Sequence, residues 1–169
     1  MSLRLSISIL ITMLCHLAFS QDGIYRSKTD FLNDEVYLIG NYLNHSSNSV
    51  IFSSSYSQLS YKAWEVWGFT DSTGTDFRTI NNQFYRIENN GPIWVYTIEF
   101  EKGAESYMSY GLNGILKEVI GKNLEPFIQN NESLHNQFKA LSKGEKNGQV
   151  YQFIAAYNKA YWQEQFSQK

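Results

Sequence analysis

The hydrophobic pattern of this chain changes its period once, near Gly114, and that change limits the folds open to it. Before Gly114, short apolar segments alternate with turn-forming residues, as in an antiparallel sheet with short loops. After it, apolar residues recur three and four positions apart, as along a helix packed on one side. This order predicts an α+β fold: an antiparallel β-meander followed by C-terminal helices packed on one face or end of the sheet.

The clearest strand runs from Ile93 to Phe100. One of its faces, which we expect to pack on the core, carries Trp94, Tyr96, Ile98 and Phe100. We expect further strands over residues 35–42, 50–53, 61–70, 77–80, 84–88 and 106–112. Residues 71–76 lie between two of these strands. They offer several oxygen atoms, but they lack the ligand spacing of an EF-hand loop, so we predict a hairpin turn there.

The final segment has the strongest helical pattern in the chain. Its apolar stripe consists of Val150, Phe153, Ile154, Tyr157 and Tyr161. A shorter stripe of Leu134, Phe138 and Leu141 predicts a second helix, and residues 143–148 between the two are expected to form a polar loop. Both stripes need an apolar surface to pack against, and the preceding sheet supplies it.

The N-terminus has the pattern of a cleavable secretory signal. Arg4 precedes a largely apolar run over residues 5–17, and small residues at Ala18 and Ser20 predict cleavage before Gln21. A membrane-spanning helix needs about 20 apolar residues, and this run is shorter. We therefore expect a signal peptide over 1–20, a single globular α+β domain over 21–169, a periplasmic or extracellular location and no transmembrane segment after cleavage.

Cys15 is the only cysteine, and it lies within the expected signal. The remaining domain cannot form a disulfide or use a thiolate, so its stability has to come from its core. His45 and His135 are far apart and lack the spacing of a zinc site, so we predict no metal and no cofactor. The formal net charge is −2 without a basic run, which argues against nucleic-acid binding.

Four carboxylates fall in or between the central strands: Asp71, Asp76, Glu88 and Glu99. Glycosidases use two carboxylates across a cleft, so this set admits a hydrolase acting on glycan or lipid. The same residues are equally suited to hairpin turns and to the solvent side of strands. No G-x-S-x-G motif is present, and we assign no catalytic residue.

Aromatic residues are the most suggestive feature, with 12 Tyr, 11 Phe and 4 Trp in the chain. If the helices cover one face of the sheet, aromatics on the other face would form a binding surface. The candidate ligand-binding residues are Trp64, Trp67, Tyr85, Trp94 and Tyr96. In the alternative, both faces are covered, one by the helices and the other by the N-terminal segment.

Short motifs over most of the chain resemble small exported proteins of the Bacteroidota kind. They are Phe19-Ser20-Gln21, Gly23-Ile24-Tyr25, Asp30-Phe31-Leu32-Asn33, residues 66–71, residues 84–88 and the Phe-Ile-x-x-Tyr-Asn sequence of residues 153–158. The resemblance implies an exported protein with central hairpins and a late helix, and it supplies no active site.

We favour a non-enzymatic binding or structural module with an unknown protein or glycan partner. The hydrolase is the first alternative. A lipocalin-like carrier of a small apolar ligand is the second, although the chain has few long strands with which to close a barrel.

Overall fold

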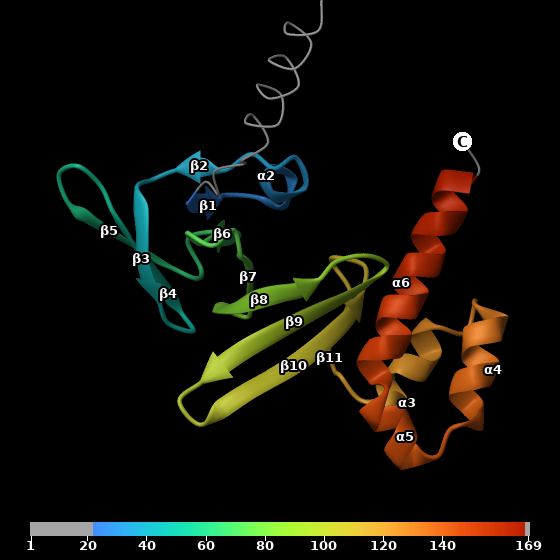
Figure 1. Cartoon of the computed structure of the whole chain (residues 1–169). Coiled ribbons are helices and arrows are strands. Elements are labelled where there is room, and N and C mark those ends of the chain that lie inside the picture. The colour runs from blue at the N-terminus through green and yellow to red at the C-terminus, as the bar shows by residue number, and fades with distance from the viewer. Residues whose placement is uncertain (1–21, 168–169) are drawn as a thin grey trace, which may run out of the picture.

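The computed structural model describes residues 22–167, and the predicted signal peptide with Cys15 lies outside them. Within the described residues, an eight-stranded sheet and a three-stranded sheet are followed by helices (Figure 1). Every strand pairing is antiparallel. The predicted α+β class, with an antiparallel sheet and C-terminal helices, is confirmed.

The large sheet contains the predicted meander. Its strands are β1 (Gly23–Tyr25), β2 (Tyr37–Leu38), β6 (Gly68–Thr70), β7 (Asp76–Ile80), β8 (Gln83–Asn89), β9 (Ile93–Phe100), β10 (Gly103–Tyr110) and β11 (Lys117–Glu118). From β6 to β11 each strand pairs with the next one in the chain, while β1 and β2 extend the sheet beyond β6. The sheet is open, since β11 and β2 form its two edges.

The small sheet consists of β3 (Asn41–His45), β4 (Ser49–Ser53) and β5 (Gln58–Lys62). The single strand predicted over 61–70 is wrong. The chain leaves the small sheet after Lys62, turns, and enters the large sheet at Gly68. The turn has its own hydrogen bonds: the Lys62 amide donates to the Glu65 carboxylate at 2.6 Å, and the Ala63 amide donates to the Asn48 carbonyl at 2.9 Å.

The helices are α2 (Lys28–Leu32), α3 (Gly121–Leu124), the 3₁₀ turn η1 (Glu125–Phe127), α4 (Glu132–Ala140), α5 (Lys143–Gly148) and α6 (Val150–Ser167). The polar loop predicted over 143–148 is wrong, because these residues form α5. Ser142 and Glu145 make a reciprocal capping box at its start, which offsets the low helix propensity of the two glycines in α5.

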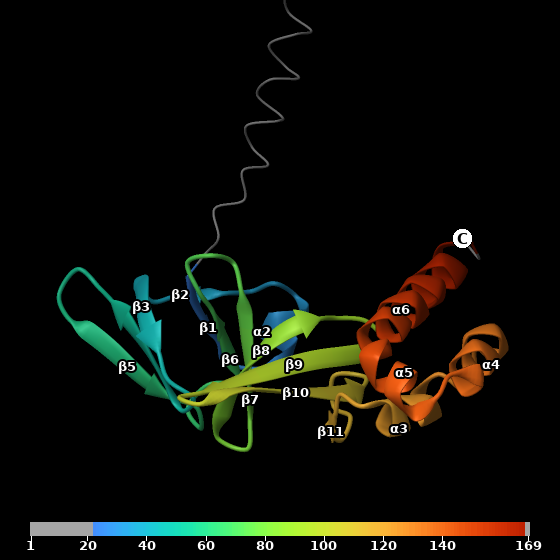
Figure 2. The same cartoon turned by 60° about the horizontal axis from the view of Figure 1, so that its bottom comes forward.

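One face of the large sheet has two separate covers, which lie at opposite ends in Figure 2. The small sheet covers one end, where Phe52 and Val50 pack with Phe69, Phe77 and their neighbours. The helices cover the other end. There, the core consists of Ile93, Val95, Met108, Leu124, Ile128, Phe138, Val150, Ile154 and Tyr157.

The opposite face contains Trp94, Tyr96 and Ile98, three of the four residues predicted to pack on the core from one side of β9. The fourth, Phe100, is 46% exposed at the end of the strand, so the prediction is wrong for this residue. Tyr96 and Ile98 are fully buried and belong to a core cluster that Trp94 flanks. The helices therefore pack against the alternate residues of the same strand. On the Trp94 side, Phe31 of α2 lies 6.1 Å from Trp94, ring centre to ring centre. Each face of the sheet thus has a cover over part of its area.

The stripe predicted on the last helix is confirmed at Val150, Phe153, Ile154 and Tyr157. These four side chains pack in the core beneath the helices. Beyond Tyr157 the helix continues past the core, and Tyr161 is 37% exposed. Within residues 22–167, no helix combines the length and the hydropathy needed to cross a bilayer.

Candidate functional site

A cavity of about 490 Å³ lies between α2, the β8–β9 loop and the last turns of α6, three segments that surround the same region in Figure 1. We call it the aromatic groove. Its lining residues are Tyr25, Phe31, Leu32, Asp34, Asp76, Asn90, Gly91, Pro92, Trp94, Tyr161 and Trp162. This volume falls in the range of small-molecule sites, and the lining combines many rings with a few polar groups, as such sites do.

Local capping fixes α2 at one wall of the groove. The Ser27 hydroxyl accepts a hydrogen bond from the Asp30 amide, while the Asp30 carboxylate accepts one from the Ser27 amide. The Ser27 hydroxyl also donates to the Asp30 carboxylate at 2.7 Å, and this bond is the main cause that holds the pKa of the Asp30 carboxyl below its usual value. The short helix thereby brings Phe31 to within 4.9 Å of Trp67 and 6.1 Å of Trp94, measured between ring centres.

The C-terminal end of α2 places a carboxylate at the groove. Asp34 follows the helix with a positive φ of 56°, its amide donates to the Phe31 carbonyl, and the Glu35 amide donates to the Asp30 carbonyl. These two bonds define a Schellman motif, whose left-handed position usually holds glycine or asparagine. Here an exposed aspartate occupies it and lines the cavity.

The opposite wall is the end of α6, which a buried asparagine attaches to the sheet. The Asn158 side chain accepts a hydrogen bond from the Ile93 amide at 3.0 Å and donates one to the Ile93 carbonyl at 2.7 Å. Gly91 lies against it, and a β-carbon at Gly91 would be 2.7 Å from the Asn158 side chain. This contact holds Tyr161 and Trp162, one turn further along α6, beside the β8–β9 loop.

Trp94 lies between exposed and buried parts of the site. Its ring stacks on buried Tyr96 at 6.3 Å and lines the groove. Deeper in, Arg78 donates to the Tyr96 hydroxyl at 2.9 Å and also to the Leu112 carbonyl. Trp67 lies 5.4 Å from the same guanidinium. The Arg78 guanidinium thus lies against both Tyr96 and Trp67, two aromatic residues beneath the groove.

Asp76 joins the aromatic groove to a second cavity. Its Oδ1 accepts hydrogen bonds from the Tyr25 hydroxyl, at 3.0 Å, and from the Thr70 hydroxyl. Burial strongly raises the pKa of the Tyr25 phenol, so Tyr25 stays a neutral donor to that carboxylate. Both bonds end on one oxygen, so Oδ2 has no hydrogen bond to a described residue.

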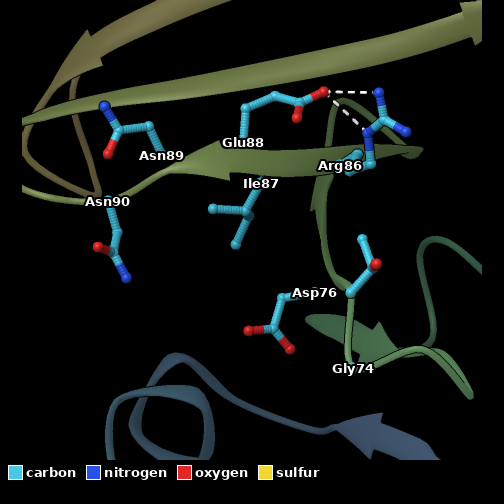
Figure 3. A pocket seen from close by; sticks show the side chains of 8 residues that line it. Gly74, Asp76, Arg86, Ile87, Glu88, Asn89 and Asn90 are labelled. Atoms are coloured by element: carbon cyan, nitrogen blue, oxygen red, sulfur yellow. Dashed lines mark hydrogen bonds and ion pairs between the residues drawn. The ribbon is translucent and has the colours of Figure 1, made fainter. Parts of the chain in front are cut away.

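The second cavity, of about 520 Å³, is polar, and we call it the polar groove (Figure 3). Its lining residues are Gly74, Thr75, Asp76, Arg86, Ile87, Glu88, Asn89 and Asn90. Asp76 and Asn90 line both cavities, so the two form one continuous site. In Figure 3 the side chains of these two residues project toward the same side of β8.

The charge of this combined site is negative. Asp34, Asp76 and Glu88 contribute carboxylates, and Arg86 is the one cation among the lining residues that the structure describes. The Arg86 guanidinium contacts Glu88 at 2.7 Å and Glu99 at 3.3 Å. An anionic ligand would therefore meet carboxylates and a cation that is already paired.

The structure disperses the five aromatic residues predicted to form a binding surface. Trp94 lines the aromatic groove, and Tyr96 and Trp67 support it from beneath. Tyr85 is buried against Tyr107 in the core. Trp64 is 63% exposed in the turn after β5 and is not a lining residue of either groove.

Of the four carboxylates considered for hydrolysis, Asp76 and Glu88 line the polar groove. Asp71 instead organises the β6–β7 turn, where it accepts hydrogen bonds from the amides of Thr73 and Thr75. The predicted hairpin turn over 71–76 is confirmed in this respect. Within residues 22–167, His, Cys, Asp and Glu side chains form no group of three or more that could hold a metal ion.

Sequence reasoning missed the groove residues supplied by the two helices: Phe31, Leu32, Asp34, Tyr161 and Trp162. One signal was available. Trp162 and Phe166 continue the aromatic character of α6 beyond the core stripe, where solvent would otherwise favour polar residues.

No family model, no curated protein and no solved structure matches this chain.

Proposed function

We propose that the protein is an exported, non-enzymatic binding module that holds a glycan in the combined aromatic and polar grooves. The observation that carries the proposal is the aromatic groove itself, in which Phe31, Trp94 and Trp162 come from three separate elements and line one cavity with Asp34 and Asp76.

A sugar ring offers an apolar C–H face and a rim of hydroxyl groups. Aromatic rings such as Trp94 and Trp162 bind the apolar face through dispersion and burial of surface. Carboxylates and amides such as Asp76 and Asn90 accept or donate hydrogen bonds to the hydroxyl groups. The continuity of the two grooves suits a chain of sugar units better than one compact molecule.

The open edges of the large sheet argue against a lipocalin-like carrier of an apolar ligand. A lipocalin-like carrier encloses its ligand in a closed barrel. Here β11 and β2 are edges of an open sheet, and the aromatic groove lies outside the sheet's core clusters, between α2 and α6. Its carboxylates would also have to lose water on contact with an apolar ligand, at a cost in free energy.

Hydrolysis is the second candidate, because Asp76 and Glu88 line the same groove. A glycosidase needs one carboxylic acid that donates a proton to the leaving group. Glu88 instead binds Arg86 in a close ion pair, and Asp76 already accepts two hydroxyl hydrogen bonds. Because Arg86 engages Glu88, the described residues of the polar groove offer no second unpaired carboxyl group beside Asp76, and we place binding ahead of catalysis.

The first experiment measures binding of the purified protein to a panel of soluble oligosaccharides by calorimetry. We expect Trp162→Ala to reduce affinity at least about tenfold, since burying an aromatic side chain against the ligand contributes roughly 1.5–3 kcal/mol and about 1.4 kcal/mol corresponds to tenfold. Trp162 is 46% exposed, so its loss leaves the core intact. Release of reducing sugar ends by the wild-type protein would support the hydrolase instead.

Trp64→Ala is the matched control. It removes the same side chain from a more exposed position outside the grooves, and we expect unchanged affinity. Equal losses in both variants would contradict the proposed site.

Mass spectrometry of the protein from envelope fractions of its own host tests export: we expect a chain beginning at Gln21, and an intact residue 1 would contradict the cleaved signal.

A further inference from the structure

The distribution of charge along the grooves narrows the class of glycan. We infer that the site takes a glycan that carries free amino groups, with the ammonium group bound between the carboxylates of Asp34 and Asp76 and the neighbouring aromatic rings. This inference rests on the proposed function and concerns the same site.

No cationic residue of the described chain, 22–167, lines the aromatic groove. Its charged lining residues are Asp34 and Asp76, and its rings are those of Tyr25, Phe31, Trp94, Tyr161 and Trp162. An ammonium ion is attracted both to carboxylates and to the faces of aromatic rings. A neutral sugar would use the rings and hydroxyl hydrogen bonds but would gain no ion pair from the carboxylates, whereas an acidic sugar would be repelled.

Asp76 is held in place for this role. The Tyr25 and Thr70 hydroxyl groups fix its Oδ1, and Oδ2 remains without a hydrogen bond to a described residue. A carboxylate fixed in this way loses little conformational freedom when it accepts a hydrogen bond from a ligand. A protonated amine fits it well, because charged donors make the shorter and stronger hydrogen bonds.

Asp34 is unfavourable for its own local structure, which makes its presence informative. Its φ of 56° lies in the left-handed region, where glycine and asparagine are preferred over aspartate. It also lies at the C-terminal end of a helix, where backbone carbonyls disfavour a negative charge. The carboxylate is therefore poorly suited to the turn, and it lines the aromatic groove.

Among residues 22–167, the grooves have no free cation to favour an acidic glycan instead. Arg86 is the one basic lining residue in this part of the chain, and it contacts the carboxylates of both Glu88 and Glu99. An acidic sugar would need to displace one of these partners. An amino sugar needs no such exchange.

The experiment compares two oligosaccharides of equal length and linkage: tetramers of glucosamine and of N-acetylglucosamine. Calorimetry at about pH 6 keeps the amines largely protonated while ordinary carboxylates stay ionised. We expect the glucosamine tetramer to bind at least about tenfold more tightly, the expected scale for a charged hydrogen bond. The preference should shrink between about 50 and 500 mM salt, because salt screens exposed charges.

Asp34→Asn removes the charge while keeping a residue suited to the left-handed turn, so the variant should fold at least as well as the wild type. We expect it to lose most of the preference for the amino sugar. Glu35→Gln is the matched control: it neutralises the next exposed carboxylate, which is not a lining residue of the groove. This control should retain the preference.

The outcomes separate the two proposals. Equal binding of both tetramers, with no effect of Asp34→Asn, would overturn the amino-sugar inference and leave glycan binding standing. Tighter binding of the acetylated tetramer or of an acidic oligosaccharide would also overturn it. Absence of binding to every oligosaccharide in the panel would overturn the proposed function itself.

Discussion

At the scale of single residues, Asn158 makes two hydrogen bonds to the backbone of Ile93 from a buried position in α6. A side-chain amide has both a donor and an acceptor, so it satisfies the amide and the carbonyl of one residue at once. Those two backbone groups lie at the start of β9, next to Trp94. The geometry of the aromatic groove thus depends on a residue that does not line it.

Replacing Asn158 by leucine should destabilise the fold by about 2–4 kcal/mol, because two buried backbone groups would lose their hydrogen-bond partners. Urea unfolding measures the change. Gln163→Ala, at an exposed position on the same helix, is the control and should change stability by less than about 0.5 kcal/mol. A similarly small change for Asn158→Leu would show that the two hydrogen bonds of Asn158 to Ile93 contribute little to stability.

His45 is a second residue with a measurable consequence. It lies partly buried against Phe77, 4.5 Å between ring centres, and forms a 2.6 Å hydrogen bond through Nδ1 with the Tyr42 hydroxyl. Burial disfavours the imidazolium ion and lowers the pKa of His45, outweighing the attraction of Glu99 and Asp71. The folded protein therefore holds this proton less tightly than the unfolded chain.

The sign of the pH dependence follows from linkage. Stability associated with neutral His45 is fully present above the unfolded-state pKa of about 6.5 and is lost as the pH falls through the folded-state pKa. We expect wild type to lose more stability than His45→Gln between about pH 7.5 and pH 5.5, as measured by urea unfolding. Equal losses in the two proteins would contradict the assignment.

At the scale of elements, α2 is short and depends on its cap. Ser27→Ala removes the N-cap side chain and should cost about 1 kcal/mol of stability. Because α2 carries Phe31 into the groove, we expect glycan affinity to fall as well, which calorimetry measures. Ser142→Ala, which removes the corresponding cap from α5, should lower stability similarly and leave affinity unchanged. Equal affinity in wild type and Ser27→Ala would contradict the role of α2.

The elements also show what periodicity can and cannot predict. The strand over 93–100 and the stripe of α6 follow from alternation and helical spacing, because packing against a single core imposes one period. The region 61–70 has aromatic residues throughout and crosses between two sheets. Continuous apolar character hides such a crossing, so the prediction places Trp64 and Trp67 on one strand, whereas both lie between β5 and β6.

The capping box of α5 was readable, since Ser142 and Glu145 stand at the required spacing. The prediction of a loop rests on the polarity of residues 143–148 and does not use this spacing. The aromatic groove was a harder case, because Phe31 and Trp162 lie near opposite ends of the described chain. Only the register of β1 against β6, and the Asn158 contact with β9, bring them to one cavity.

At the scale of the whole molecule, the large sheet supports two different covers on one face and carries α2 on the other. The small sheet and the helices bury separate clusters, centred on Phe69 and on Ile154. The aromatic groove forms where α2, from one side of the sheet, approaches the end of α6, from the other. Its shape therefore depends on the large sheet that positions both walls.

The measurement that tests this account most directly is an NMR titration of the indole N–H signals with the glucosamine tetramer. The chain has four tryptophans, and each gives its own signal. We predict large shifts for Trp94 and Trp162, a smaller one for Trp67, which contacts Phe31, and none for Trp64. Shifts confined to Trp64, or a ligand that binds without moving Trp94 and Trp162, would contradict the assignment of the groove.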